Sequence, residues 1–202
     1  MIVCNTYNFG VRHRFGITFE LPQDPQLYHG TWLNGGACYW VFGRCIGEMQ
    51  YTVPLCDVML LLENINKRTS FQCEKDFFYA DARQILQVMI EDFENEVDDS
   101  VKEKNCFGFK GTFDFWRGYD IRLELDIMDD YIVLLLEHET QARLIVGKLG
   151  ENRDFYEFQS EHTLHAGEVQ AVLHEAFGWL QERYQQEVIN EKNCPLALGI
   201  VW

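Results

Sequence analysis

Apolar residues recur along this chain with two different periods, and each period predicts its own kind of element. Two aromatic-rich stretches, residues 15–21 and 36–43, are bounded by proline or glycine, which is typical of β-strands. After Pro54 the apolar residues fall at helical spacing, and proline is tolerated at a helix start, so a helix is predicted from Leu55 onward. Two further helices are predicted, over about residues 81–96 and 165–189.

The middle of the chain has the alternation that strands require. Residues 121–127 alternate apolar and charged side chains, which predicts a half-buried strand, and Asp129 and Asp130 follow in a turn. Residues 131–136 are almost wholly apolar, which predicts a central strand covered on both faces. Further strands are predicted over residues 107–115, 142–147 and 156–160. The predicted fold class is therefore α+β, an antiparallel β-meander with packed helices and a long amphipathic helix near the C-terminus.

The composition predicts one domain over residues 1–202, because 47% of the residues are hydrophobic and no Pro/Gly/Ser-rich linker divides the chain. The N-terminus lacks the basic segment, apolar run and small-residue cleavage site of a secretion signal. The apolar runs are far shorter than the roughly 20 residues that a membrane helix needs. We therefore expect a cytoplasmic protein.

The net charge of −15 comes entirely from the later part of the chain. Residues 1–70 carry five Lys/Arg against five Asp/Glu, whereas residues 71–202 carry twelve against twenty-seven. Such a field repels nucleic acid and anionic membranes and attracts a basic protein surface. We therefore expect no nucleic acid and no membrane among the partners. The alternative is that the acidic charge serves solubility alone.

Motifs for catalysis or cofactor binding are absent from the sequence: it contains no phosphate loop, dinucleotide fingerprint, nucleophile elbow or H-E-x-x-H zinc motif. The seven cysteines form no C-x-x-C pair and are interpreted as reduced, structural thiols. Asp126, Asp129 and Asp130 lack the spacing of an EF-hand calcium loop. We expect no catalytic residue, no cofactor and no metal.

Histidines near the predicted C-terminal helix leave one question open. Glu161, His162, His165 and Glu168 would form a metal or general-base site if they converged. The favoured interpretation is that these polar side chains cap free amides at a junction between a strand and a helix.

An aromatic hairpin within residues 36–47 is expected to serve the fold rather than binding. Strand alternation places Tyr39 and Val41 on one face and Trp40 and Phe42 on the other, so one set is buried. We expect Trp40 to be buried, with Tyr39, which has a polar tip, as the candidate exception.

The first third of the chain resembles immunity proteins of bacterial polymorphic toxin and contact-dependent growth inhibition systems. The resemblance rests on an F-x-I-x-F-E-L strand at residues 15–21, a tryptophan at Trp32, the aromatic hairpin ending in Ile46-Gly47, and Leu55-Cys-Asp-Val-Met59 opening a helix. It implies a non-enzymatic protein that binds and neutralises the C-terminal domain of a cognate toxin. Such toxins are often nucleases with a basic substrate groove, which an acidic inhibitor can occupy. The alternative is a small-molecule-binding or hydrolytic α+β domain with acidic site residues.

Two acidic groups are the candidates for toxin binding. One group follows the predicted helix over residues 81–96, and the other lies on the predicted strand and turn over residues 121–130, with two aromatic residues before it as possible anchors. The helix-tail group contains Asp92, Glu94, Glu96, Asp98 and Asp99. The strand-and-turn group contains Glu124, Asp126, Asp129 and Asp130, and the aromatic anchors are Trp116 and Tyr119.

Overall fold

The computed structural model describes residues 3–24, 33–49, 53–68, 70–94, 116–151 and 155–193. The chain divides into two compact units, and each is described by itself. Unit 1 comprises Met1–Lys67 together with Val169–Trp202, and unit 2 comprises Arg68–Glu168. The α+β class predicted from the sequence is confirmed. The single domain over residues 1–202 stays a prediction.

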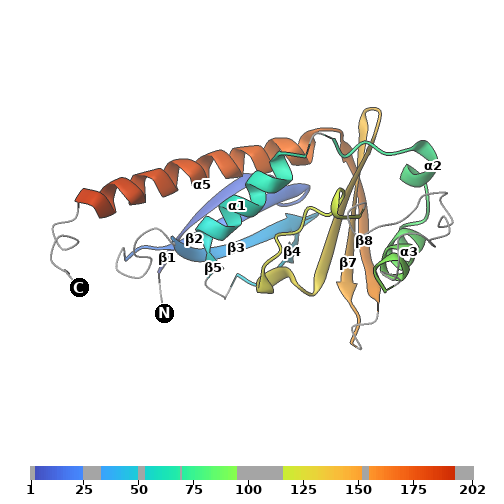
Figure 1. Cartoon of the computed structure of the whole chain (residues 1–202), viewed down its shortest axis with the longest axis horizontal. Helices are drawn as coiled ribbons and strands as arrows, with labels where there is room; N and C mark the ends of the chain where they lie inside the picture. The colour runs from blue at the N-terminus through green and yellow to red at the C-terminus, as the bar shows by residue number, and fades with distance from the viewer. Residues whose placement is uncertain are drawn as a thin grey trace. The chain divides into compact units, whose positions relative to one another are not determined.

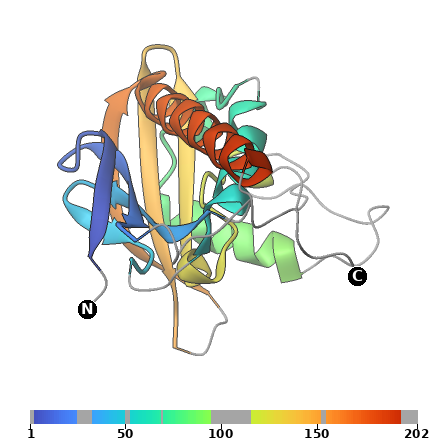
Figure 2. The ribbon, with the colours of Figure 1, turned by 90° about the vertical axis from the view of Figure 1, so that its left-hand side faces the viewer.

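Unit 1 is an antiparallel sheet of five strands in the order β1-β2-β3-β4, with the short β5 paired to β3. Two helices, α1 and α5, cover one face of this sheet (Figure 1), and β1 lies at its edge (Figure 2). The strands are β1 Cys4–Gly10, β2 Phe15–Pro22, β3 Asn34–Val41, β4 Arg44–Ile46 and β5 Val53–Pro54. The helices are α1 Leu55–Asn66 and α5 Glu168–Asn193.

Strand alternation decides which side chains form the core of unit 1. Phe9, Phe19 and their neighbours on the same face are buried, and the ring of Trp179 on α5 stacks 5.7 Å from that of Phe19. Tyr7 lies in the same aromatic cluster, 4.4 Å from Trp179. The strand β1 was not predicted from the sequence. Its inward residues include the aromatic Tyr7 and Phe9, which can be recognised as core residues only once β1 is paired with β2.

The aromatic hairpin forms, but the set of buried residues is the opposite of the one predicted. Phe42 and Gly43 have φ angles of 48° and 82°, which fits a tight two-residue turn between β3 and β4. Tyr39 and Val41 are buried on the helix-covered face, whereas Trp40 is half-buried on the other face. The indole N–H of Trp40 donates to the hydroxyl of Thr18, and Arg12 lies 4.4 Å from the centre of its ring.

Unit 2 is an antiparallel sheet in the order β6-β7-β8, with α3 packed against β8 (Figure 1). Its core joins the apolar residues of β6 and β7 to those of α2 and α3, including Leu134, Ile145, Phe77 and Met89. The strands are β6 Tyr131–His138, β7 Gln141–Leu149 and β8 Tyr156–His165. The helices are α2 Lys75–Phe78, α3 Ala82–Glu94 and the single 3-10 turn η3 Asp126–Met128.

The central position predicted for residues 131–136 is confirmed by hydrogen bonds along both edges of β6. One edge pairs with β7. On the other edge, the amide of Glu137 donates to the carbonyl of Phe71, and the amide of Leu135 donates to the carbonyl of Tyr119. Both faces of this strand are buried from Ile132 to Glu137.

The prediction of a strand over residues 121–127 is wrong. Just before this segment, Asp120 forms an isolated bridge to Leu134, and the amide of Ile121 donates to the carbonyl of Val133. The chain then turns on itself, because the amide of Leu125 donates to the carbonyl of Leu123 and the amide of Met128 to that of Leu125. The alternation in the sequence arises because this segment is buried on one side. An irregular segment buried on one side shows the same alternation as a strand.

Two elements near the C-terminus begin or end at other residues than predicted. The strand β8 runs to His165 rather than residue 160, because its register with β7 continues to the pair Gln141–His165. The last helix is α5, from Glu168 to Asn193. The strands predicted over residues 107–115, as well as Trp32, lie outside the described residues. In the described part of the chain, no helix is both long and apolar enough to cross a membrane.

Candidate functional site

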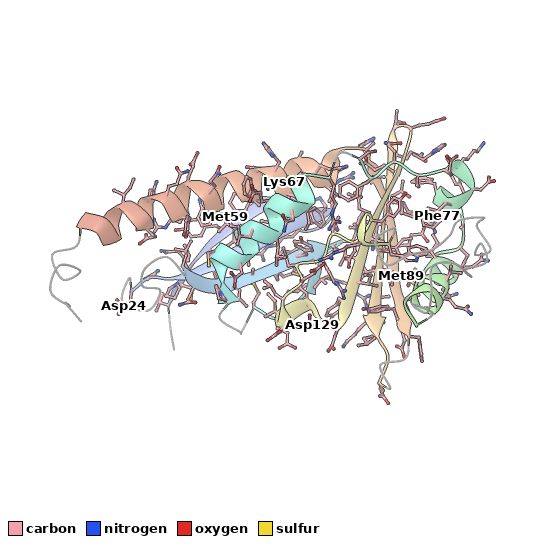
Figure 3. The ribbon with its side chains drawn as sticks, in the orientation of Figure 1. Asp24, Met59, Lys67, Phe77, Met89 and Asp129 are labelled. Atoms are coloured by element: carbon pink, nitrogen blue, oxygen red, sulfur yellow. The ribbon has the colours of Figure 1, made fainter. Side chains whose placement is uncertain are left out.

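Four exposed carboxylates gather on the segment that leads into β6, and we call them the acidic turn: Glu124, Asp126, Asp129 and Asp130. Their backbone is anchored by apolar neighbours, since Leu123 and Met128 are fully buried. Asp129 lies on the outer side of this turn (Figure 3). The sequence therefore identified these residues as exposed, although they do not share the face of a strand as predicted.

Arg117 is a cation that pairs with a member of the acidic turn. Its guanidinium lies 3.2 Å from a carboxylate oxygen of Glu124, and both side chains are about half exposed, at 52% and 42%. An exposed pair of this kind contributes roughly 0 to 1 kcal/mol to stability. The pair leaves the acidic character of the turn in place, because the other three members of the turn are carboxylates.

A buried ion pair fixes the start of the acidic turn to the sheet. Asp120 is 8% exposed, and one of its carboxylate oxygens lies 2.9 Å from Nε of Arg122. Arg122 also donates to the carbonyl of Tyr131 and to the hydroxyl of Tyr156. Burial raises the pKa of Asp120 to about 6, although Arg122 and Arg68 oppose this shift. The sequence offered no signal for this clamp, because alternation over residues 121–127 puts Arg122 on the solvent face of the predicted half-buried strand.

The pocket beside this clamp is too small for an organic ligand. It is lined by residues of α3, the acidic turn and β6, among them Met89, Asp120, Arg122 and Ile132. Its volume is about 10 Å³, which is room for roughly one water molecule. This pocket therefore gives no support to a small-molecule site.

The two predicted aromatic anchors have different surroundings. Trp116 is 1% exposed, and its ring meets that of Phe77 edge-on with centres 5.7 Å apart. A side chain so deeply buried cannot contact a partner, so Trp116 is a core residue and we drop it as a binding candidate. Tyr119 is half-buried against the same Phe77, and burial raises the pKa of its hydroxyl to about 12.

The helix-tail group lies largely beyond the described residues. The backbone of Asp92 and Glu94 belongs to the last turn of α3. The side chains of these two residues, and all of Glu96, Asp98 and Asp99, lie outside what the structure describes. Their part in binding stays a prediction.

The histidine and glutamate cluster does not converge. Neighbouring residues of a strand point to opposite faces, so Glu161 and His162 of β8 cannot share a site. Glu161 pairs with Arg143 at 2.5 Å, and the carboxylate of Glu168 accepts the amide of His165 at 3.3 Å. Among the described residues, no group of three or more His, Cys, Asp or Glu side chains is placed to hold a metal ion.

Comparison with known proteins identifies the class to which this α+β chain belongs, the bacterial immunity proteins. In particular, the chain belongs to the family described as immunity protein 42 (Imm42), whose model matches residues 1–179. The resemblance seen in the first third of the sequence is thereby confirmed, and the match extends through the acidic part as well.

One solved structure supports the fold. The crystal structure of CdiI from Burkholderia dolosa AUO158 matches with a TM-score of 0.61 and 18% sequence identity, covering 85% of this chain and 99% of that chain. At this identity the similarity shows the fold alone. No curated protein matches the sequence.

Proposed function

We propose that this protein binds a cognate bacterial toxin and neutralises it by occupying it, without catalysing a reaction. The observation that carries the proposal is the family match, because the immunity protein model spans residues 1–179. The fold shared with a CdiI protein supports the same class. We also propose that the protein acts in the cytoplasm, where a delivered toxin would meet its target.

The proposal extends to the chemistry of the toxin, which we infer to be a basic C-terminal domain such as a nuclease. A net charge of −15 favours a positively charged partner and speeds their encounter by long-range attraction. A groove that binds phosphates presents this kind of surface, and carboxylates can occupy the phosphate positions.

The acidic turn is the surface that we propose for the first contact with the toxin. Its four carboxylates are exposed, and the buried Asp120–Arg122 pair anchors the segment to the sheet. Anchoring lowers the entropy lost when the segment is held by a partner. Tyr119 is half-buried and lies shortly before the acidic turn in the sequence. It is the aromatic candidate for contact with the toxin. The helix-tail group is a second candidate surface.

Inhibition is expected to be stoichiometric. The cognate toxin domain would be titrated with the purified protein while the toxin's activity is measured, and this activity should fall linearly to zero near one equivalent. A binder cannot silence more toxin than its own molar amount. Complete inhibition at a tenth of an equivalent would show catalytic inactivation instead, and no inhibition at several equivalents would contradict the proposed function.

Charge reversal tests the proposed surface. Changing Glu124, Asp126, Asp129 and Asp130 together to lysine is expected to slow association with the toxin by about tenfold or more at low ionic strength. The effect should shrink at 0.5 M salt, because salt screens long-range attraction between exposed charges. Stopped-flow or surface-based binding kinetics at both salt concentrations would measure it.

A matched control separates local charge from net charge. Glu48, Asp76, Glu175 and Glu182 are exposed carboxylates outside both acidic groups, and changing them to lysine alters the net charge equally. This control variant should slow association far less than the acidic-turn variant. Equal slowing by the two would mean that net charge, not this surface, guides the encounter. If only the corresponding helix-tail variant is slow, the contact surface lies there.

A further inference from the structure

Two cysteines of unit 1 lie on the same face of the β3–β4 hairpin. The register pairs Trp40 of β3 with Cys45 of β4, so Cys38, which is two residues from Trp40, points to the same side as Cys45. Cys38 and Cys45 are therefore diagonal neighbours across the hairpin. This face is opposite to the one that carries the buried Tyr39 and Val41.

The two thiols differ in access and are in contact. Cys45 is exposed, whereas Cys38 is fully buried. Their side chains are close enough to shift each other's pKa, and the positive charge of Arg12 acts on both sulfurs. The thiol of Cys45 also donates to the carbonyl of Gly47, with 3.7 Å between sulfur and oxygen. Arg12 is held in place by two hydrogen bonds to the side chain of Asn8 and by its position over the ring of Trp40.

These contacts give the two thiols opposite pKa shifts, so that Cys45 reacts first. The neighbouring Cys38 side chain lowers the pKa of Cys45 to about 7, and Arg12 lowers it too, against the effect of partial burial. The Cys45 side chain and burial raise the pKa of Cys38, which therefore keeps its proton. A solvent-accessible thiolate beside a second thiol is the usual arrangement of a redox-sensitive cysteine pair.

We propose that Cys45 and Cys38 form a redox-active dithiol that reacts with hydrogen peroxide. The Cys45 thiolate attacks one peroxide oxygen, so that an S–O bond forms, the O–O bond breaks, and hydroxide leaves. Cys38 then attacks the Cys45 sulfenic acid; the S–S bond forms, the S–O bond breaks, and the proton of Cys38 leaves with the hydroxyl as water. Hydroxide from the first step takes up the proton that Cys45 had released. Two thiols lose two electrons in total, and one peroxide becomes two waters.

The local backbone allows the two sulfurs to approach. The β3–β4 ladder ends at the pair Tyr39–Ile46, and Gly47 follows with a φ angle of 101°. Cys38 itself is held in the β2–β3 ladder opposite Thr18, so the movement falls to Cys45 on the three-residue strand β4, where small shifts break few backbone hydrogen bonds. Such shifts can bring the two Cα atoms within the roughly 4.4 to 6.8 Å that a disulfide needs.

The other cysteines of the described chain are less reactive by the same physics. Burial raises the pKa of Cys4 and of Cys56, and it raises that of Cys73 to about 12. A site built from Cys45 and Cys38 should therefore stand out from these thiols in any kinetic comparison.

The test is oxidation of the full chain with hydrogen peroxide at pH 7, followed by alkylation and peptide mass spectrometry. The parent protein is expected to form an intramolecular Cys38–Cys45 disulfide, with the loss of two hydrogens. Cys38→Ala should instead accumulate sulfenic acid on Cys45, trapped by dimedone, and Cys45→Ser should give neither product. Without oxidant, iodoacetamide should label Cys45 at least about tenfold faster than Cys73.

Controls keep the result interpretable. Cys4→Ser should behave as the parent, and circular dichroism should confirm that each variant is folded. If Cys38→Ala does not fold, the disulfide map and labelling rates of the parent decide alone. The proposal is overturned if Cys45 labels no faster than Cys4 and Cys56, or if peroxide yields only disulfides between molecules or between other cysteines.

Discussion

Replacing Trp116 by alanine is expected to lower the free energy of unfolding by about 3 to 5 kcal/mol, as for other large buried aromatic residues. Trp116 is among the largest fully buried side chains and lies in the core of unit 2 with Phe77 and Met89. Truncation would leave a cavity between α2, α3 and β6 that the surrounding residues cannot fill. Urea denaturation followed by circular dichroism measures this loss.

Trp40→Ala is the matched comparison for Trp116. Trp40 is half-buried, and its removal costs part of a hydrophobic contact and the hydrogen bond to Thr18. We expect a loss of about 1 to 2 kcal/mol. If Trp116→Ala were as stable as the parent but bound the toxin more weakly, Trp116 would be a contact residue and its assignment to the core would be wrong.

Gly10→Ala is expected to destabilise the protein by about 3 kcal/mol, through two independent effects. Gly10 has a φ angle of 70°, which alanine adopts only with strain. An added Cβ would also lie 2.5 Å from the carbonyl oxygen of Phe15 and 2.7 Å from a methyl group of Val172 on α5. Neither a backbone carbonyl nor a packed helix can move away cheaply, so the strand and the helix would have to separate.

Gly43→Ala isolates the backbone effect. Gly43 has a φ angle of 82°, and a Cβ there would meet nothing within 4 Å. It should therefore cost only the strain of the left-handed backbone, about 1 to 2 kcal/mol. The midpoints of thermal or urea unfolding of the two variants give the difference. Equal losses would mean that Gly10 needs only its φ angle and that α5 does not pack closely there.

Local patterns predicted the regular elements well where one element buries one face. The helix after Pro54, the strand β2 and the long C-terminal helix follow from the spacing of apolar residues alone. The aromatic strand and the family resemblance could also be recognised from the sequence. Both rest on packing residues that follow one another in a fixed order along the chain. The match of the immunity protein model to residues 1–179 bears this out.

The candidate site was predicted only in part. Exposure of the acidic turn was foreseeable, since runs of carboxylates are seldom buried. The burial of Trp116 was not, because a tryptophan is found in cores and at interfaces alike and only its neighbours decide. The sequence also suggested a strand where the chain turns on itself between Leu123 and Met128.

By itself, the sequence determined the α+β class, the main helices and strands, the family and the excess of acidic charge. Tertiary structure alone decided which face of the hairpin is buried, how Asp120 and Arg122 anchor the acidic turn, and that Cys38 and Cys45 meet. Alternation along a strand shows which residues share a face, but which face is covered depends on the helices that pack against the sheet. The clamp works because Arg122 reaches Tyr131 and Tyr156, and Cys38 and Cys45 approach because β3 pairs with β4. These contacts join separate elements, so no pattern within one element contains them.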